Sequence, residues 1–91
     1  MVTPEKYVKN LLQKRNLTQK SVLERMKELK LADEKTLVRQ KLNNAINIKL
    51  GYVWARRIEI ALDLPEYILI NMIGKPSENE WKRIKEIKPH D

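Results

Sequence analysis

A chain of 91 residues has the length of one domain, and its 19 Lys and Arg against 12 Asp and Glu, a formal net charge of +7, favour a polyanionic partner. It contains no cysteine, which excludes disulfides and thiolate metal sites. No segment approaches the ~20 apolar residues of a membrane span, and no apolar signal run follows Met1, so we expect a cytoplasmic protein with no membrane partner.

Each of the first two predicted helices begins at a threonine. Thr3 precedes Pro4, which suits the first helical position, and an apolar stripe extends to Asn16, where asparagine suits a C-cap. Thr18 is the N-cap of the second helix, which we expect to end around Lys30.

The third predicted helix spans residues 34–46 and follows Asp33 as its N-cap. Its apolar side recurs at helical spacing in Val38, Leu42, Ala45 and Ile46. At 100° per residue the far side carries Thr36, Gln40, Asn43, Asn44 and Asn47, with Arg39 and Lys41 on the two flanks. This helix therefore has an apolar back and an amide-rich front edged with cations.

The remaining elements are a loop at 47–51 and helices at 52–62, 65–73 and 78–87. The segment 65–73 is apolar nearly all round, which predicts burial in the core or at an interface. Ser77 and Glu80 form a capping box before the last helix. Trp54 is expected in the core, whereas Trp81 could pack on the domain or on a second subunit.

The predicted fold class is all-α, with five helices and a short C-terminal tail helix. We expect residues 1–74 to form the domain and residues 75–91 to form a tail that is a candidate dimerisation element.

Charge is unevenly distributed, because no carboxylate occurs between Glu34 and Glu59. The cations of this block are Lys35, Arg39, Lys41, Lys49, Arg56 and Arg57. A solvated face usually mixes both signs, so a cationic, amide-rich block favours contact with phosphates and base edges. Asparagine is a poor helix former, and base readout gives a reason for Asn43 and Asn44; a role in ending the helix is the alternative.

Residues 4–73 resemble the lambda-repressor-like, Cro/Xre-type helix-turn-helix family. The likeness rests on Thr18-Gln19 at the start of the second helix and on the segment from Ile58 to Pro65, with Asp63 where the family commonly has glycine. The stretch from Gln19 to Val38 is a few residues longer than the tight motif, which predicts a longer second helix or a longer turn.

The resemblance implies that the third helix reads the major groove and that Thr18 and Gln19 contact phosphate. It places base contacts at Lys35, Thr36, Arg39 and Gln40, with Asn43 and Asn44 further along the helix. Further candidates for phosphate contact, from charge and position, are Lys41, Lys49, Tyr52, Arg56 and Arg57. The two arginines could instead pair with Glu24, Glu28 or Glu59 on the surface.

Catalytic chemistry has little support in the sequence. The sole histidine, His90, has no clustered carboxylate near it, and Ser21 and Ser77 have no evident base. Two glycines cannot form a Gly-rich phosphate loop, and no metal-ligand spacing occurs. We expect no enzymatic activity, no metal, no cofactor and no small-molecule substrate.

The first functional hypothesis is a homodimeric, sequence-specific regulator of transcription, repressor or Cro-like, that binds double-stranded DNA. The alternative is a protein-interaction module, such as an antitoxin or adaptor, that uses the apolar fifth helix and the tail. RNA binding is less favoured, because readers of single-stranded RNA usually stack bases on exposed rings.

Overall fold

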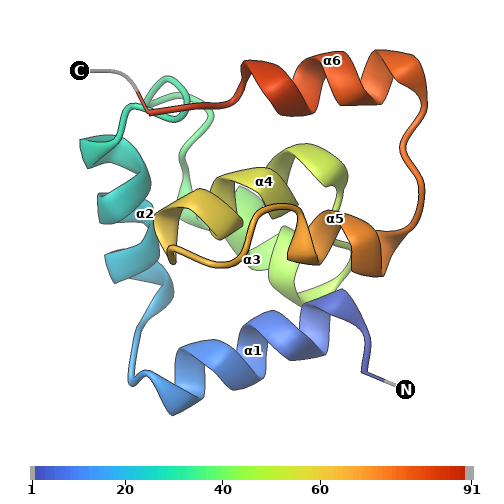
Figure 1. The fold of residues 1–91 in the computed structure, drawn as a ribbon. Coiled ribbons are helices and arrows are strands. Elements are labelled where there is room, and N and C mark those ends of the chain that lie inside the picture. The colour runs from blue at the N-terminus through green and yellow to red at the C-terminus, as the bar shows by residue number, and fades with distance from the viewer. Residues whose placement is uncertain (1, 90–91) are drawn as a thin grey trace.

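Six helices build the part of the chain that the computed structural model describes, residues 2–89 (Figure 1), and no strand occurs within this range. Their bounds are α1 Pro4–Lys14, α2 Gln19–Glu28, α3 Arg39–Asn47, α4 Tyr52–Ala61, α5 Ile68–Ile73 and α6 Glu78–Glu86. The prediction of an all-α fold is thereby confirmed. His90 lies outside the described residues.

The predicted N-caps of α1, α2 and α6 are confirmed by side-chain hydrogen bonds. The Thr3 hydroxyl accepts from Lys6 N at 3.2 Å, and Thr18 forms a capping box with Ser21. Ser77 forms the predicted box at the start of α6. Such caps satisfy the free N–H groups of the first turn, so these three helix starts could be located from local sequence alone.

The third helix, predicted over residues 34–46, is present, but its predicted start is wrong, because α3 begins at Arg39 and ends at Asn47. The Asp33 carboxylate accepts from Thr36 N at 2.9 Å and closes a turn instead of capping a helix. After this turn Leu37 is buried in the core, and Val38 has an extended backbone at the N-cap position. The turn between α2 and α3 is therefore long and irregular, the second of the two options that the spacing left open.

The start of the fifth helix also differs, since α5 begins at Ile68 instead of Pro65. Tyr67 has a left-handed backbone with φ 65°, which interrupts any helix running from the proline.

The helices enclose one core, and α4 lies in its middle (Figure 1). α4 packs against α2, α5 and α6, while α3 packs against α1 and α2. Fully buried side chains come from every helix, for example Val8, Met26, Leu42, Ile58 and Ile84. Because Ile84 of α6 belongs to this core, the tail helix packs against the same hydrophobic core as the other five helices.

Within residues 2–89, no helix combines the length and apolar character needed to cross a bilayer.

Glu59 is the one charged residue buried among the described residues, at 1 % exposure. Its carboxylate accepts from the backbone N–H groups of Leu69 at 2.7 Å and of Ile70 and Tyr67 at 3.2 Å. It thus caps the start of α5 from α4, a role that the sequence did not suggest because the partners lie eight to eleven positions away.

Candidate nucleic-acid interface

The outward face of α3 carries three amide side chains in a row. Leu42, Ala45 and Ile46 are buried, and a rotation of 100° per residue places Gln40, Asn44 and Asn47 opposite them. Within residues 2–89, the exposed side chains of Gln40 and Asn44 take part in no hydrogen bond. Their donors and acceptors are therefore available to an external partner.

The flank of α3 that faces α2 is tied down by a chain of amides. Gln19 Nε2 donates to Asn43 Oδ1 at 3.1 Å, and Asn47 Nδ2 donates to the same oxygen at 2.7 Å and to Asn43 O at 3.0 Å. This link joins the first residue of α2 to the middle of α3 on the exposed surface. Of the six predicted base-contacting residues, Asn43 thus has its side-chain oxygen already engaged.

The opposite flank of α3 faces α4 across a shallow hollow of about 350 Å³. Its lining includes Lys41, Ile48, Lys49 and the half-buried ring of Trp54. Ile48 is 75 % exposed, the highest value among the large apolar side chains within the described range. The sequence analysis did not name Ile48 as a candidate site residue. The one feature that could have indicated it is its position, as an apolar residue directly after the last turn of a cationic helix.

The loop that carries Ile48 and Lys49 is anchored from α1. Glu5 Oε2 accepts from Leu50 N at 2.7 Å, and Leu50 itself is buried. Because the hydrogen bond comes from a residue 45 positions away, no local pattern could have indicated it.

Lys35 and Thr36 do not lie on α3, contrary to the prediction that placed them at the front of a helix. They belong to the turn that precedes it, where Lys35 is exposed and Thr36 is half-buried with its N–H bound to Asp33. Arg39 and Gln40 instead occupy the first turn of α3. This helix therefore begins about five residues later than expected.

Several exposed cations gather on this surface, with a few carboxylates beside them. Among the described residues, no ion pair involves Lys35, Arg39, Lys41 or Lys49, all of which are exposed. Glu24 and Glu34 line a hollow with Arg39, and Asp33 lies close to Lys41. Hydrogen bonds from the side chain and backbone of Thr36, together with Lys41 and Arg57, hold the pKa of Asp33 below its usual value. Asp33 is consequently ionised at neutral pH and offsets only part of the local charge.

The two arginines of α4 have different surroundings. Arg56 donates to Glu59 Oε1 at 3.2 Å and to Glu66 Oε1 at 3.4 Å, and its guanidinium stacks 4.6 Å from the Tyr67 ring centre. Arg56 thus pairs with Glu59, one of the three carboxylates named as its alternative partners, and also with Glu66. This side chain is therefore engaged within the fold.

Arg57 instead lies over the Trp54 ring, 4.9 Å from its centre, beside the hollow of α3. Burial lowers the pKa of Arg57, while Asp33 acts in the opposite direction, and a guanidinium keeps its charge at neutral pH. Arg57 Nε is buried and has no hydrogen-bond partner within the described part of the chain. Arg57 thus adds charge beside Trp54, which lines the same hollow as Lys41 and Asn44.

The other predicted phosphate contacts lie at the starts of helices. Thr18 and Gln19 begin α2, and the Thr18 hydroxyl is occupied by the capping box. Tyr52 begins α4 and lines a separate hollow with Glu80 and Arg83 of α6. Gln19 therefore adjoins the amide row of α3, whereas Tyr52 faces the tail helix.

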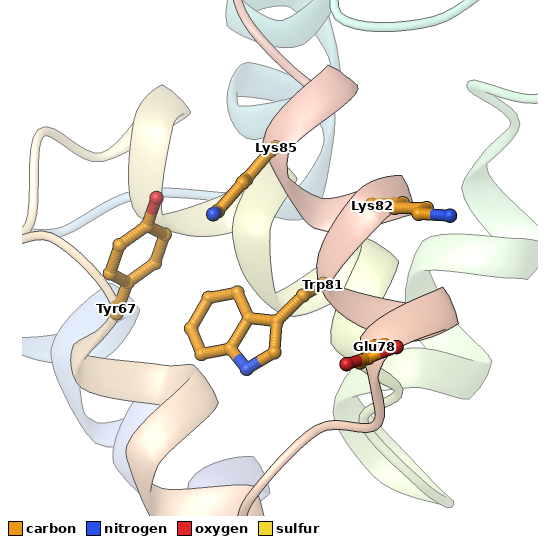
Figure 2. A pocket seen from close by; sticks show the side chains of 5 residues that line it. All are labelled: Tyr67, Glu78, Trp81, Lys82 and Lys85. Carbon is orange, nitrogen blue, oxygen red and sulfur yellow. The ribbon is translucent and has the colours of Figure 1, made fainter.

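A larger open hollow, of about 680 Å³, lies between the start of α5 and α6 (Figure 2). Trp81 packs edge-on against Tyr67 with ring centres 5.1 Å apart, and Lys85 Nζ lies 6.0 Å from the Trp81 ring centre. Figure 2 shows the Lys85 amine directed toward the two rings and Lys82 directed away from them. Trp81 thus packs on its own domain, one of the two placements that the sequence left open.

No group of His, Asp and Glu side chains within residues 2–89 could hold a metal ion.

Comparison with known proteins found no matching family model, no similar curated protein and no similar solved structure.

Proposed function

We propose that this protein binds double-stranded DNA sequence-specifically and regulates transcription in the manner of a repressor or Cro protein. In this proposal α2 and α3 form a helix-turn-helix of the lambda-repressor type, with residues 29–38 as an extended turn. The outward face of α3 lies in the major groove.

One observation carries the proposal: on α3, the side-chain amides of Gln40 and Asn44 lie between the exposed cations Arg39 and Lys41, and none of the four has a side-chain hydrogen bond or ion pair within residues 2–89. Glutamine and asparagine bond adenine N6 and N7 in the major groove, arginine bonds guanine O6 and N7, and lysine neutralises phosphates. A helix of nine residues is long enough to span several base edges at 1.5 Å per residue. The chemistry of this face thus fits both parts of a duplex, the bases and the backbone.

The roles follow from position on α3. Arg39, Gln40 and Asn44 read base edges, while Asn43 and Gln19 hold α2 and α3 in register through their shared hydrogen bond. Lys41, Lys49 and Arg57 neutralise phosphates on the flank that faces α4. Arg56 has no part in this interface because two carboxylates already hold it. We expect a homodimer that reads two half-sites about 34 Å apart.

The protein-interaction alternative would use the apolar segment of α5. Leu69 and Ile70 are fully buried and Ile68 and Ile73 are half-buried, which leaves Met72 as the exposed large apolar side chain of that helix. The core therefore already occupies most of the α5 surface that the alternative needs and leaves it the hollow beside Trp81 of the tail, so we favour DNA binding.

The test begins with selection of bound sequences from random duplex DNA. Gln40→Ala or Asn44→Ala should lower the preference for the selected base at one position by about 5- to 150-fold, the effect of losing one good base contact. Lys49→Ala should weaken all duplexes alike, because a phosphate contact carries no base information. Competition binding with each single-base variant of the site measures both effects.

Two outcomes would contradict the proposal. The first is the absence of any selected sequence at moderate salt. The second is an equal loss across all duplexes for Gln40→Ala and Lys49→Ala, since base readout would then have no residue to depend on.

A further inference from the structure

Ile48 is the feature of the α3 surface that the proposed function leaves unexplained. Its side chain is 75 % exposed, and its backbone N–H donates to Asn44 O at 2.9 Å as the C-cap of α3. Contact with an external apolar group would be favourable for Ile48, because it would remove the exposed apolar side chain from water. The anchoring of this loop through Leu50 and Glu5 fixes where Ile48 lies before any partner arrives.

The surroundings of Ile48 restrict the nature of that partner. Lys41, Asn44 and Lys49 line the same hollow, and no ion pair within the described range neutralises either lysine. A purely apolar partner, such as the hydrophobic face of another protein, would bury the two lysine charges without an opposite charge to offset their desolvation. The fitting partner carries an apolar group within an anionic surface, and the 5-methyl group of thymine in the major groove is such a group.

We propose that Ile48 is a specificity-determining residue that contacts the 5-methyl group of a thymine in the target site. This inference rests on the proposed function. Asn44 and Ile48 are four residues apart, hence about 6 Å apart along α3 and on adjoining parts of its outward face. Asn44 recognises an adenine edge and Ile48 a thymine methyl, so the half-site carries A·T pairs where the C-terminal end of α3 lies.

The experiment replaces thymines of the selected duplex one at a time with deoxyuridine, which removes only the methyl group. The wild-type protein should lose about fourfold in affinity at one thymine, the effect of exposing one buried methyl group. Ile48→Ala should bind the thymine and deoxyuridine duplexes with equal affinity, because the partner of the methyl group is gone. Met72→Ala, which truncates an exposed apolar side chain on α5, is the matched control and should keep the fourfold difference.

The possible failures are distinguishable. If the protein prefers no duplex sequence, the proposed function is contradicted, and the role of Ile48 with it. If a sequence is preferred but no thymine position distinguishes wild type from Ile48→Ala, the proposed function stands and the role of Ile48 is overturned. Thermal unfolding of Ile48→Ala should match wild type because the side chain is exposed, which excludes loss of fold as the cause.

Discussion

The Glu59 carboxylate is the residue-scale feature on which the placement of α5 depends. It is 1 % exposed and receives three backbone N–H groups at the start of a helix that has no side-chain cap of its own. It also pairs with Arg56 at 3.2 Å, so its charge is balanced without water. The strained left-handed backbone of Tyr67 persists because one of these hydrogen bonds holds it.

Glu59→Gln should therefore destabilise the fold by about 3 kcal/mol, since it removes the charge from several hydrogen bonds and leaves Arg56 partly unpaired in a half-buried site. Denaturant unfolding followed by circular dichroism measures the free energy of unfolding. Glu66→Gln is the matched control, because Glu66 binds the same arginine but its side chain is 66 % exposed. That variant should change stability by less than about 0.5 kcal/mol, and equal losses for the two variants would contradict a special role for Glu59.

At the element scale, the sequence predicted those features that depend on neighbouring residues. The starts of α1, α2 and α6 follow from Thr3, Thr18 and Ser77, each of which bonds a backbone N–H within one turn. The start of α3 could not be predicted in the same way. Asp33 suits both a helix cap and a turn, and the burial of Leu37 against distant elements decides between them.

The candidate site was predictable to a similar extent. Helical spacing correctly placed Gln40 and Asn44 opposite the buried side of α3. Spacing gave no information on contacts between elements, such as Gln19 with Asn43, Glu5 with Leu50 or Arg56 with Glu59. These contacts depend on how the helices pack, which the local pattern does not contain.

The end of α2 provides a prediction at this scale. Lys30 follows its last turn with φ 53°, a left-handed conformation that costs a residue with a Cβ about 1 kcal/mol or more. The chain accepts this cost because Leu31 N then donates to Met26 O at 3.1 Å and Leu31 is buried. Lys30→Gly should raise the free energy of unfolding by about 0.5–1 kcal/mol, measured by denaturant unfolding.

Lys30→Ala is the control for this variant. It removes the same exposed charge but keeps the Cβ, so the strain remains and stability should stay within about 0.5 kcal/mol of wild type. A gain with alanine as large as that with glycine would mean that charge, and not backbone strain, limits stability at this turn.

On the scale of the whole molecule, part of the net charge of +7 lies on the α3 surface, where Lys35, Arg39, Lys41 and Lys49 are exposed. In the part of the chain that the structure describes, the carboxylates of Glu28, Glu59 and Glu66 pair with Arg25 and Arg56, away from α3. Asp33 lies close to Lys41 and Arg57, and Glu24 and Glu34 line a hollow with Arg39. Arg25 and Arg56 are thus held in ion pairs, whereas the exposed cations of the α3 surface form none within residues 2–89 and are free to meet a polyanion.

If DNA is the partner, as proposed, these cations determine how binding depends on salt. The logarithm of the association constant should fall linearly with the logarithm of salt concentration, with a slope of about 0.9 for each phosphate that is neutralised. Lys49→Ala should make the slope shallower by about 0.9 per bound protomer, because Lys49 is exposed and unpaired within residues 2–89. Gln40→Ala should leave the slope unchanged, since an amide displaces no counterion.

Lys82→Ala removes an equal charge from α6, on the hollow beside Trp81, and should also leave the slope unchanged. Fluorescence anisotropy titrations at several salt concentrations give these slopes, and an equal change for Lys49→Ala and Lys82→Ala would show that net charge alone, without a defined surface, governs the binding.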